Sequence, residues 1–173
     1  MKKPVALAAI VALSCALLGC AEGPVPRTTG DTASASSFTQ QVEAPADAPA
    51  LTGIADLGNA SFRIDPSWPE FTAVDLVQWD LSDTVTLTAA VCEPSDQLPD
   101  EFADWCDASW TADGCAWVYS DQTSSAGKTW VLGVASTDGE TAGVVFMATE
   151  KGAPEDAAMP PDVWAVFDSV AIE

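Results

Sequence analysis

The densest group of chemically capable side chains lies between residues 93 and 121, which contain carboxylates but no Lys or Arg. The carboxylates are Glu93, Asp96, Asp100, Glu101, Asp104, Asp107, Asp113 and Asp121. Calcium takes roughly six to eight oxygen ligands and can use such a loop, although no EF-hand spacing is present. Trp110 stands in the polar stretch DASWTADG, where an exposed ring can stack on a ligand. Trp110, Asp104, Asp107 and Asp113 are therefore speculative ligand-binding residues, and a solvated acidic surface is the alternative interpretation.

Residue types needed for the commonest catalytic sites are missing. The chain has no His, which excludes Ser-His-Asp and Cys-His arrangements and any zinc site that contains His. Carboxylate pairs able to do acid–base chemistry are expected by chance in so acidic a sequence. We therefore predict a protein that is not an enzyme, with no cofactor, no metal and no catalytic residue.

Cysteines offer two further kinds of chemistry, cross-linking and lipid attachment. Cys92, Cys106 and Cys115 lie in the main part of the chain, and outside the cytoplasm such thiols can form disulfides. The residues between Cys106 and Cys115 are polar and turn-prone, so we predict a Cys106–Cys115 disulfide. The competing pair is Cys92–Cys106.

The N-terminus has the three parts of a secretion signal, with Lys2 and Lys3 preceding an apolar run and a small residue. The apolar run Val5–Gly19 is about 22 Å long as a helix, short of the roughly 30 Å hydrocarbon core of a membrane. Its end, Leu17-Leu18-Gly19-Cys20, resembles the bacterial lipobox, although a residue smaller than Leu18 is more usual there. That resemblance implies lipidation of Cys20 and a location on the extracytoplasmic face of the cell membrane.

The chain after this signal is strongly acidic and changes composition near Leu51. From Cys20 onward, four basic residues stand against 26 acidic ones, a formal charge of −22. Such a surface repels nucleic acid and anionic headgroups, so membrane contact must come from the lipid. Residues 21–50 are rich in Ala, Pro, Thr and Ser, which predicts a disordered tether. We therefore expect a signal peptide over 1–19, a lipidated Cys and linker over 20–50, and a single globular domain over 51–173.

Patterns within residues 51–173 predict an α+β fold, an antiparallel β-sheet flanked by a few short helices. Two helices are expected, one from Pro99 to about Trp105 and one over Asp162–Phe167. The expected strands are Ala60–Ile64, Thr72–Trp79, Thr84–Val91, Ala116–Ser120, Thr129–Ala135, Ala142–Thr149 and Val170–Ile172.

Two segments of this domain resemble the PsbP/Mog1-like superfamily, including its LpqN-type lipoproteins. One is Phe62–Trp68, in which a strand runs into Pro66 and then Trp68; the other is Val163–Val170. Ser67 stands where that family usually has Gly before the Trp. The resemblance implies an α-β-α sandwich used for binding or scaffolding, with no transferable active site.

These observations predict a lipid-anchored envelope module that binds or scaffolds a protein or envelope component without catalysis. A small-ligand, carbohydrate or calcium binder that uses the acidic loop 93–121 and Trp110 is the alternative. The expected partners are the membrane, through the lipid, and an envelope protein; nucleic acid is not expected.

Overall fold

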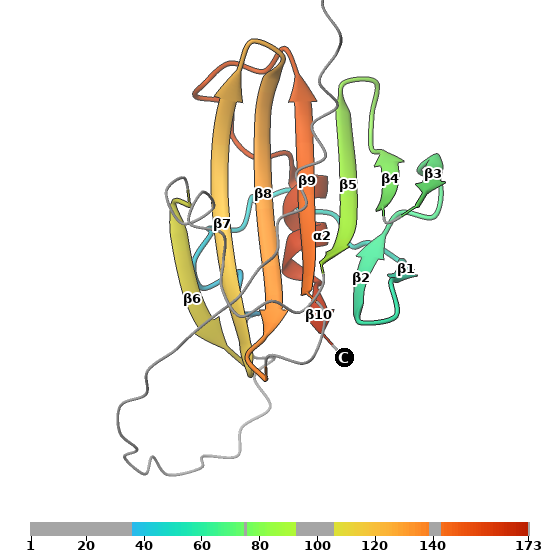
Figure 1. Ribbon diagram of the computed structural model, residues 1–173. Coiled ribbons are helices and arrows are strands. Elements are labelled where there is room, and N and C mark those ends of the chain that lie inside the picture. Colours follow the sequence, from blue (N-terminus) through green and yellow to red (C-terminus); the bar gives the residue numbers. More distant parts are fainter. Residues whose placement is uncertain (1–35, 75, 93–105, 139–142, 173) are drawn as a thin grey trace, which may run out of the picture.

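The fold is built on one large antiparallel sheet (Figure 1). The computed structural model describes residues 36–74, 76–92, 106–138 and 143–172. Seven strands form the sheet in the order β3-β4-β5-β9-β8-β7-β6. Their bounds are Glu70–Ala73 (β3), Leu76–Asp80 (β4), Val85–Cys92 (β5), Ala108–Ala112 (β6), Cys115–Ser124 (β7), Gly127–Ser136 (β8) and Gly143–Lys151 (β9).

A smaller sheet and a helix pack against one face of the large sheet. Gly53–Asp56 (β1), Ala60–Ile64 (β2) and Ala171–Ile172 (β10) form an antiparallel three-stranded sheet in the order β1-β2-β10. Helix α2 (Pro161–Asp168) lies behind the large sheet in Figure 1. It begins where Pro161, lacking an N–H, fits the first turn of a helix.

The predicted fold class is wrong. Two antiparallel sheets dominate the described residues, and α2 is the one helix among them, so the molecule is mostly β and not an α-β-α sandwich. The long strands β7, β8 and β9 carry most of the sheet, and among the described residues a helix packs on one face of it only. The helix expected from Pro99 to Trp105 falls outside the described residues.

Most of the predicted strands are confirmed, with one important difference. The expected strand Thr72–Trp79 is a hairpin, in which Val74 lies in a turn between β3 and β4. β6 was not predicted, because its sequence is short and polar. The hairpin of β6 and β7 turns at Asp113 and Gly114, whose φ values of 53° and 75° match the two-residue turn that twists with the strands.

Alternation of side chains along the strands gives the large sheet two different faces. The face toward α2, here called the inner face, carries the aromatic and branched residues that form the main core. Phe62 of β2 joins the two sheets, with its ring 5.4 Å from Trp79 and 4.9 Å from Phe146. Phe167 of α2 packs 6.0 Å from Phe146. The inner face is therefore filled from both the helix and the smaller sheet.

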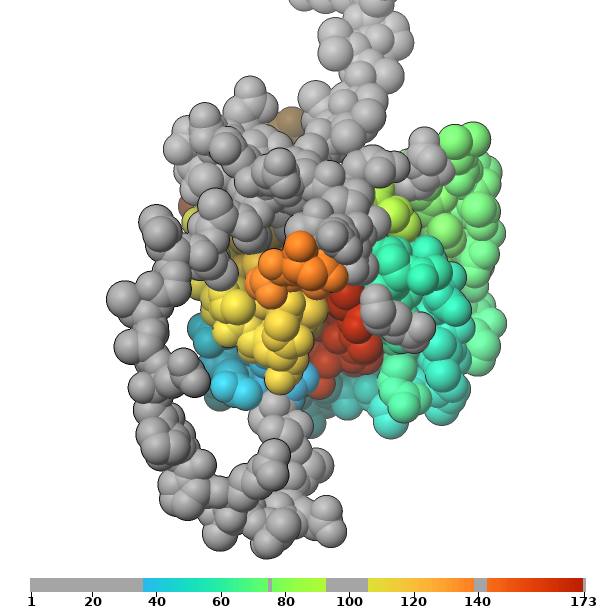
Figure 2. Space-filling model, turned by 60° about the horizontal axis from the view of Figure 1, so that its bottom comes forward, coloured from blue at the N-terminus to red at the C-terminus, as the bar shows by residue number. Residues whose placement is uncertain are grey.

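The folded part begins earlier than the expected boundary at Leu51. Phe38 is fully buried in the main core, with its ring 5.7 Å from that of Phe167. The hydroxyls of Ser36 and Thr39 donate to the Asp168 carboxylate at the end of α2. Figure 2 shows this N-terminal segment, in blue, against the yellow β6–β7 region. One aromatic anchor thus ties the segment to the domain despite a composition typical of a tether.

Candidate functional site

Trp110, the aromatic residue singled out as a ligand contact, lies on β6 and not in a loop. Its ring stacks on Trp117 at 5.8 Å with an interplanar angle of 11°. It also lies 6.5 Å from the ring of Phe38. Trp110 is half-buried, so much of its ring takes part in the core. The indole N–H groups of Trp110 and Trp117 are nevertheless buried without a hydrogen-bond acceptor.

The carboxylates proposed with Trp110 do not converge on one point. Asp107 accepts hydrogen bonds from the Ser120 hydroxyl at 3.0 Å and from the Asp121 N–H at 2.7 Å, so local partners hold it. Asp113 is exposed in the turn at the other end of β6, and the five residues of this strand span roughly 15 Å. Asp104 lies outside the described residues. Among the described residues, no three His, Cys, Asp or Glu side chains are grouped to hold a metal ion.

The structure does not bring Cys106 and Cys115 together. All three described thiols are free. The Cys106 thiol donates to the carbonyls of Ala108 at 2.8 Å and Tyr119 at 3.5 Å, and Tyr119 lies four residues along β7 from Cys115, roughly 13 Å away. A disulfide needs Cα atoms within about 7 Å.

The other two thiols lie on opposite faces of the sheet. Cys115 belongs to the main core and Cys92 to a smaller apolar cluster, against which Cys106 also packs. Burial raises the pKa of the Cys92 thiol. Burial, then the charges of Asp113 and Asp138, raises the pKa of the Cys115 thiol. Both are therefore poor nucleophiles at neutral pH.

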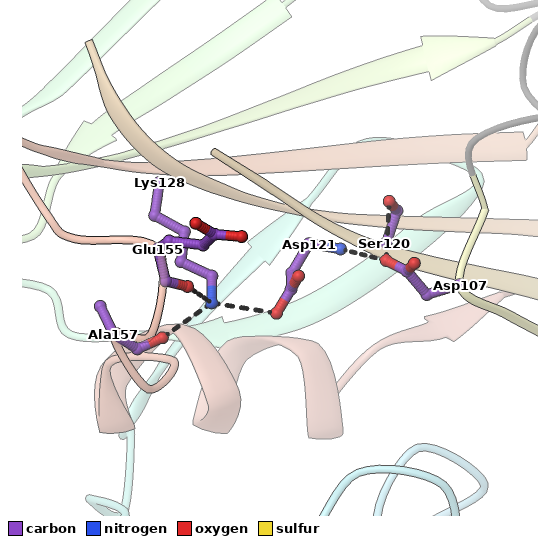
Figure 3. A network of polar contacts seen from close by, with 6 residues as sticks. All are labelled: Asp107, Ser120, Asp121, Lys128, Glu155 and Ala157. Carbon is purple, nitrogen blue, oxygen red and sulfur yellow. Dashed lines mark hydrogen bonds and ion pairs between the residues drawn. The ribbon is translucent and has the colours of Figure 1, made fainter. Parts of the chain in front are cut away.

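Lys128 is a buried charged residue with three polar partners, and nothing in its sequence context predicted this. Lys128, on β8 just after the β7–β8 hairpin, donates from Nζ to the carbonyls of Glu155 at 2.8 Å and Ala157 at 2.9 Å (Figure 3). Its Nζ also lies 3.1 Å from a carboxylate oxygen of Asp121. These bonds use the three donors of the ammonium group, so Lys128 holds the 155–157 segment in place and has no proton left to offer a ligand.

The hairpin before Lys128 depends on Gly127, where φ is 139°. A Cβ at this position would collide with the backbone carbonyl of Glu150. The geometry of the hairpin therefore requires glycine at position 127.

The face of the large sheet opposite the inner face, the outer face, carries a band of side chains that are not ionisable. The register places two neighbouring rows across β3, β4, β5, β9, β8 and β7. The rows are Phe71, Gln78, Thr88, Met147, Val131 and Ser120, and Ala73, Leu76, Ala90, Val145, Gly133 and Val118. We call these twelve residues the outer strip. It forms a band without formal charge on a strongly acidic molecule.

Exposure changes along the outer strip. Val118, Val131 and Val145 are buried, whereas 63% of Phe71 and 46% of Met147 are exposed. Leu76, on β4 beside β3, is also exposed. Adjacent to the strip, the hydroxyls of Thr129 and Thr149 bond to each other at 3.1 Å. An apolar surface therefore lies open to solvent toward the β3 side of the sheet, as binding surfaces do.

Comparison with known proteins found neither a matching family model nor a matching curated protein. The function must therefore be argued from the outer strip and the chemistry of the chain. Within the described ranges, no helix is long and apolar enough to span a membrane. Cys20 and the signal segment lie outside these ranges.

The outer strip was missed because a single strand does not show which of its faces will be covered. Thr86, Thr88 and Ala90 alternate with Leu87 and Ala89 in β5, and this alternation predicted a strand over Thr84–Val91. The order of the seven strands, which joins these half-exposed faces into one surface, has no local signal in the sequence.

Proposed function

We propose that this protein is a lipid-anchored module on the extracytoplasmic face of the cell membrane, and that it binds a protein partner through the outer strip. The observation that carries this proposal is the exposure of Phe71, Leu76 and Met147 on one band without ionisable side chains. Exposed apolar side chains on an ordered sheet cost solubility, and binding a partner removes them from water.

A protein partner fits this surface better than a nucleic acid or a lipid bilayer. The acidic chain repels phosphate-rich surfaces, whereas an apolar band with an acidic surround favours a protein with an apolar patch and a cationic rim. The charges then steer the encounter and exclude acidic competitors, and the outer strip supplies the buried centre of the interface.

The anchor is proposed from Cys20 and the segment before it. Between Cys20 and the first described residue, Ser36, lie 15 residues, and the extended chain reaches at most about 55 Å. The folded domain would therefore bind partners close to the membrane. Changing Cys20→Ala is expected to release the protein from the membrane fraction or to block its processing. Equal membrane retention of both forms would contradict the anchor.

The binding proposal is tested by affinity capture from detergent-solubilised envelope, followed by measurement with the purified partner. Met147→Lys places a charge in the centre of the exposed part of the outer strip. Ile54→Lys is the matched control, because Ile54 is also an exposed apolar strand residue, at 69%, but belongs to the smaller sheet.

We expect a partner whose affinity falls at least tenfold with Met147→Lys and stays within twofold with Ile54→Lys, since a charge buried at an interface centre costs far more than one at a solvated site. Equal effects of the two changes, or none, would contradict binding through the outer strip.

One observation favours a second candidate function, a small-ligand site at Trp110. Two buried indole N–H groups lack acceptors, and a sugar or another neutral ligand has the oxygens to satisfy them. Titration with neutral oligosaccharides, followed by tryptophan fluorescence and calorimetry, tests this candidate. Saturable heat that disappears in Trp110→Phe would support it, and no heat with any oligosaccharide would remove it.

A further inference from the structure

We infer that strand β3 binds an extended segment of the partner by β-strand addition, and that this segment alternates apolar and basic side chains. The inference rests on the proposed function and specifies the part of the partner that meets the end of the outer strip. It follows from three properties of β3: its open backbone, its two different faces, and the acidic charge around it.

β3 is an end strand of the seven-stranded sheet, and all four of its residues are exposed. The Asp80 N–H donates to the Pro69 carbonyl at 3.0 Å, which fixes which residues bond across the β3–β4 pair. Because hydrogen-bonded and non-bonded pairs alternate, Phe71 and Ala73 bond toward β4. Glu70 and Thr72 therefore point their N–H and C=O groups to the open edge, as a template for another strand.

The side chains of β3 specify what that strand should carry. Phe71 and Ala73 belong to the outer strip, so residues opposite them in an added strand would extend the apolar band. Glu70 and Thr72 lie on the other face. A carboxylate oxygen of Glu70 accepts from the Trp79 indole N–H at 3.2 Å, which holds this charge in a fixed position at the edge. A basic side chain opposite Glu70 would meet it.

Charge around the edge favours a cationic partner over a second copy of this chain. Residues 64–92 contain no Lys or Arg. Asp65 precedes Glu70 by five residues in the sequence, and Asp80 is the last residue of β4, next to Trp79, which pairs with Glu70. A second copy would bring the same acids to the interface. Four edge residues are also too few to bury the roughly 1,200–2,000 Å² of a stable dimer. A flexible basic segment needs less area, because it gains from both backbone bonds and charge.

The experiment uses the full chain in neutral detergent micelles with three blocked heptapeptides as probes. The first alternates Val and Lys, the second has the same composition in two blocks, and the third alternates Val and Glu. We expect saturable binding of the first, at least tenfold weaker binding of the second, and none of the third. On binding of the first peptide, hydrogen exchange of the Glu70 and Thr72 amide protons should slow at least tenfold. This measurement uses the wild-type protein and therefore does not depend on whether a variant folds.

Thr72→Pro and Thr111→Pro form a matched pair of variants. Proline removes an N–H, and at Thr72 this group points away from β4, so the β3–β4 bonds remain. Thr111 occupies the equivalent outward position on β6, the opposite end strand, since Ala112 and Cys115 form the bonded pair that flanks the two-residue turn. Thr72→Pro should weaken binding of the Val-Lys peptide at least tenfold, and Thr111→Pro should change it less than twofold.

Several results would overturn strand addition at β3. These are equal binding of the alternating and block peptides, equal effects of the two proline variants, and a wild-type dimer in sedimentation that Thr72→Pro dissolves. If capture of the envelope partner depends on Met147 but not on Thr72, the outer strip binds by another mode, and only this inference fails. If capture depends on neither, the proposed function fails as well.

Discussion

Phe146 and Met147 are neighbours on β9, yet they belong to two different environments. Phe146 is fully buried on the inner face, between Phe62 and Phe167, while Met147 is 46% exposed on the outer face. One strand thus contributes to the core with one side chain and to the surface with the next. The main core thus lies on the inner face, whereas the outer face is buried around Val118, Val131 and Val145 and exposed at Met147.

The two faces also differ in the kind of side chain they use. The inner face interlocks aromatic rings from the sheet, the helix and the N-terminal segment, and such rings carry much of the burial in a small domain. The outer strip has one aromatic residue, Phe71, and consists otherwise of aliphatic, small and uncharged polar residues. The exposed part of the outer strip, at Phe71, Leu76 and Met147, contributes less to folding than the buried valines and is free to change under selection for binding. This division underlies the proposed function, and the following substitutions probe it.

The largest effect is expected from the pair Phe146→Ala and Met147→Ala. Loss of a fully buried Phe should lower the free energy of unfolding by about 3–5 kcal/mol, whereas truncation of the half-exposed Met should cost less than about 1 kcal/mol. Urea unfolding followed by tryptophan fluorescence measures both. Similar losses in the two variants would mean that the outer face is as much a part of the core as the inner face.

Phe38→Ala tests whether the N-terminal segment belongs to the inner face. Because Phe38 is fully buried among four aromatic rings, we expect a loss of about 3 kcal/mol. In the wild type, limited proteolysis should leave a stable fragment that begins before Ser36. A stable fragment that begins near Leu51, together with little loss of stability in Phe38→Ala, would show that residues 36–50 are part of the tether and not of the folded domain.

Lys128→Met tests how much the hydrogen bonds of the buried Lys128 contribute to the free energy of unfolding. The change leaves the carbonyls of Glu155 and Ala157 without their donor, so we expect a loss of about 2 kcal/mol. Asp121→Asn is the control: because Asp121 is 46% exposed, its loss should cost less than about 1 kcal/mol. Equal losses in thermal unfolding would show that the ion pair, and not the two carbonyl bonds, carries the stability.

The smallest effect concerns pH. Burial, then the charges of Asp65 and Asp47, raises the pKa of Asp162 above its usual value. A raised native pKa means that this group stabilises the fold fully below the unfolded pKa, near 3.8, and that this contribution is lost as pH rises through the native pKa.

Between pH 3 and pH 7, Asp162→Asn should therefore lose less stability than the wild type, by less than about 1 kcal/mol. Parallel unfolding curves at both pH values would show that Asp162 has the same pKa in both states.

Local patterns in the sequence were sufficient to locate β2, β5, β8, β9 and α2. Alternation marks Val85–Cys92, and Pro160-Pro161 marks the start of the helix. Local patterns did not predict β6, because a short polar strand such as Ala108–Ala112 resembles a loop. They also led to a fold with helices on both faces of the sheet, since a short helical pattern does not show which face of a sheet the helix will cover.

Long-range packing explains the other features that the sequence did not predict. Phe38 is the one aromatic residue in a segment rich in Ala, Pro and Ser, and contacts with β6, β7 and α2, more than 70 residues away, keep it buried. Lys128 is buried because the 155–157 carbonyls meet it. The outer strip likewise exists only once six strands lie in register. A single aromatic residue in a segment rich in Ala, Pro and Ser, such as Phe38, can therefore indicate that the segment packs on the folded domain.

The most direct test of binding through the outer strip is site-specific photo-crosslinking in the living cell. A photoreactive phenylalanine analogue is placed at Met147 in the outer strip, which is 46% exposed, and, in a second strain, at Ile54 on β1, which is 69% exposed but lies outside the strip. We predict one discrete cross-linked protein from position 147 and none from position 54. The same pattern at both positions, or no adduct at 147, would contradict the account.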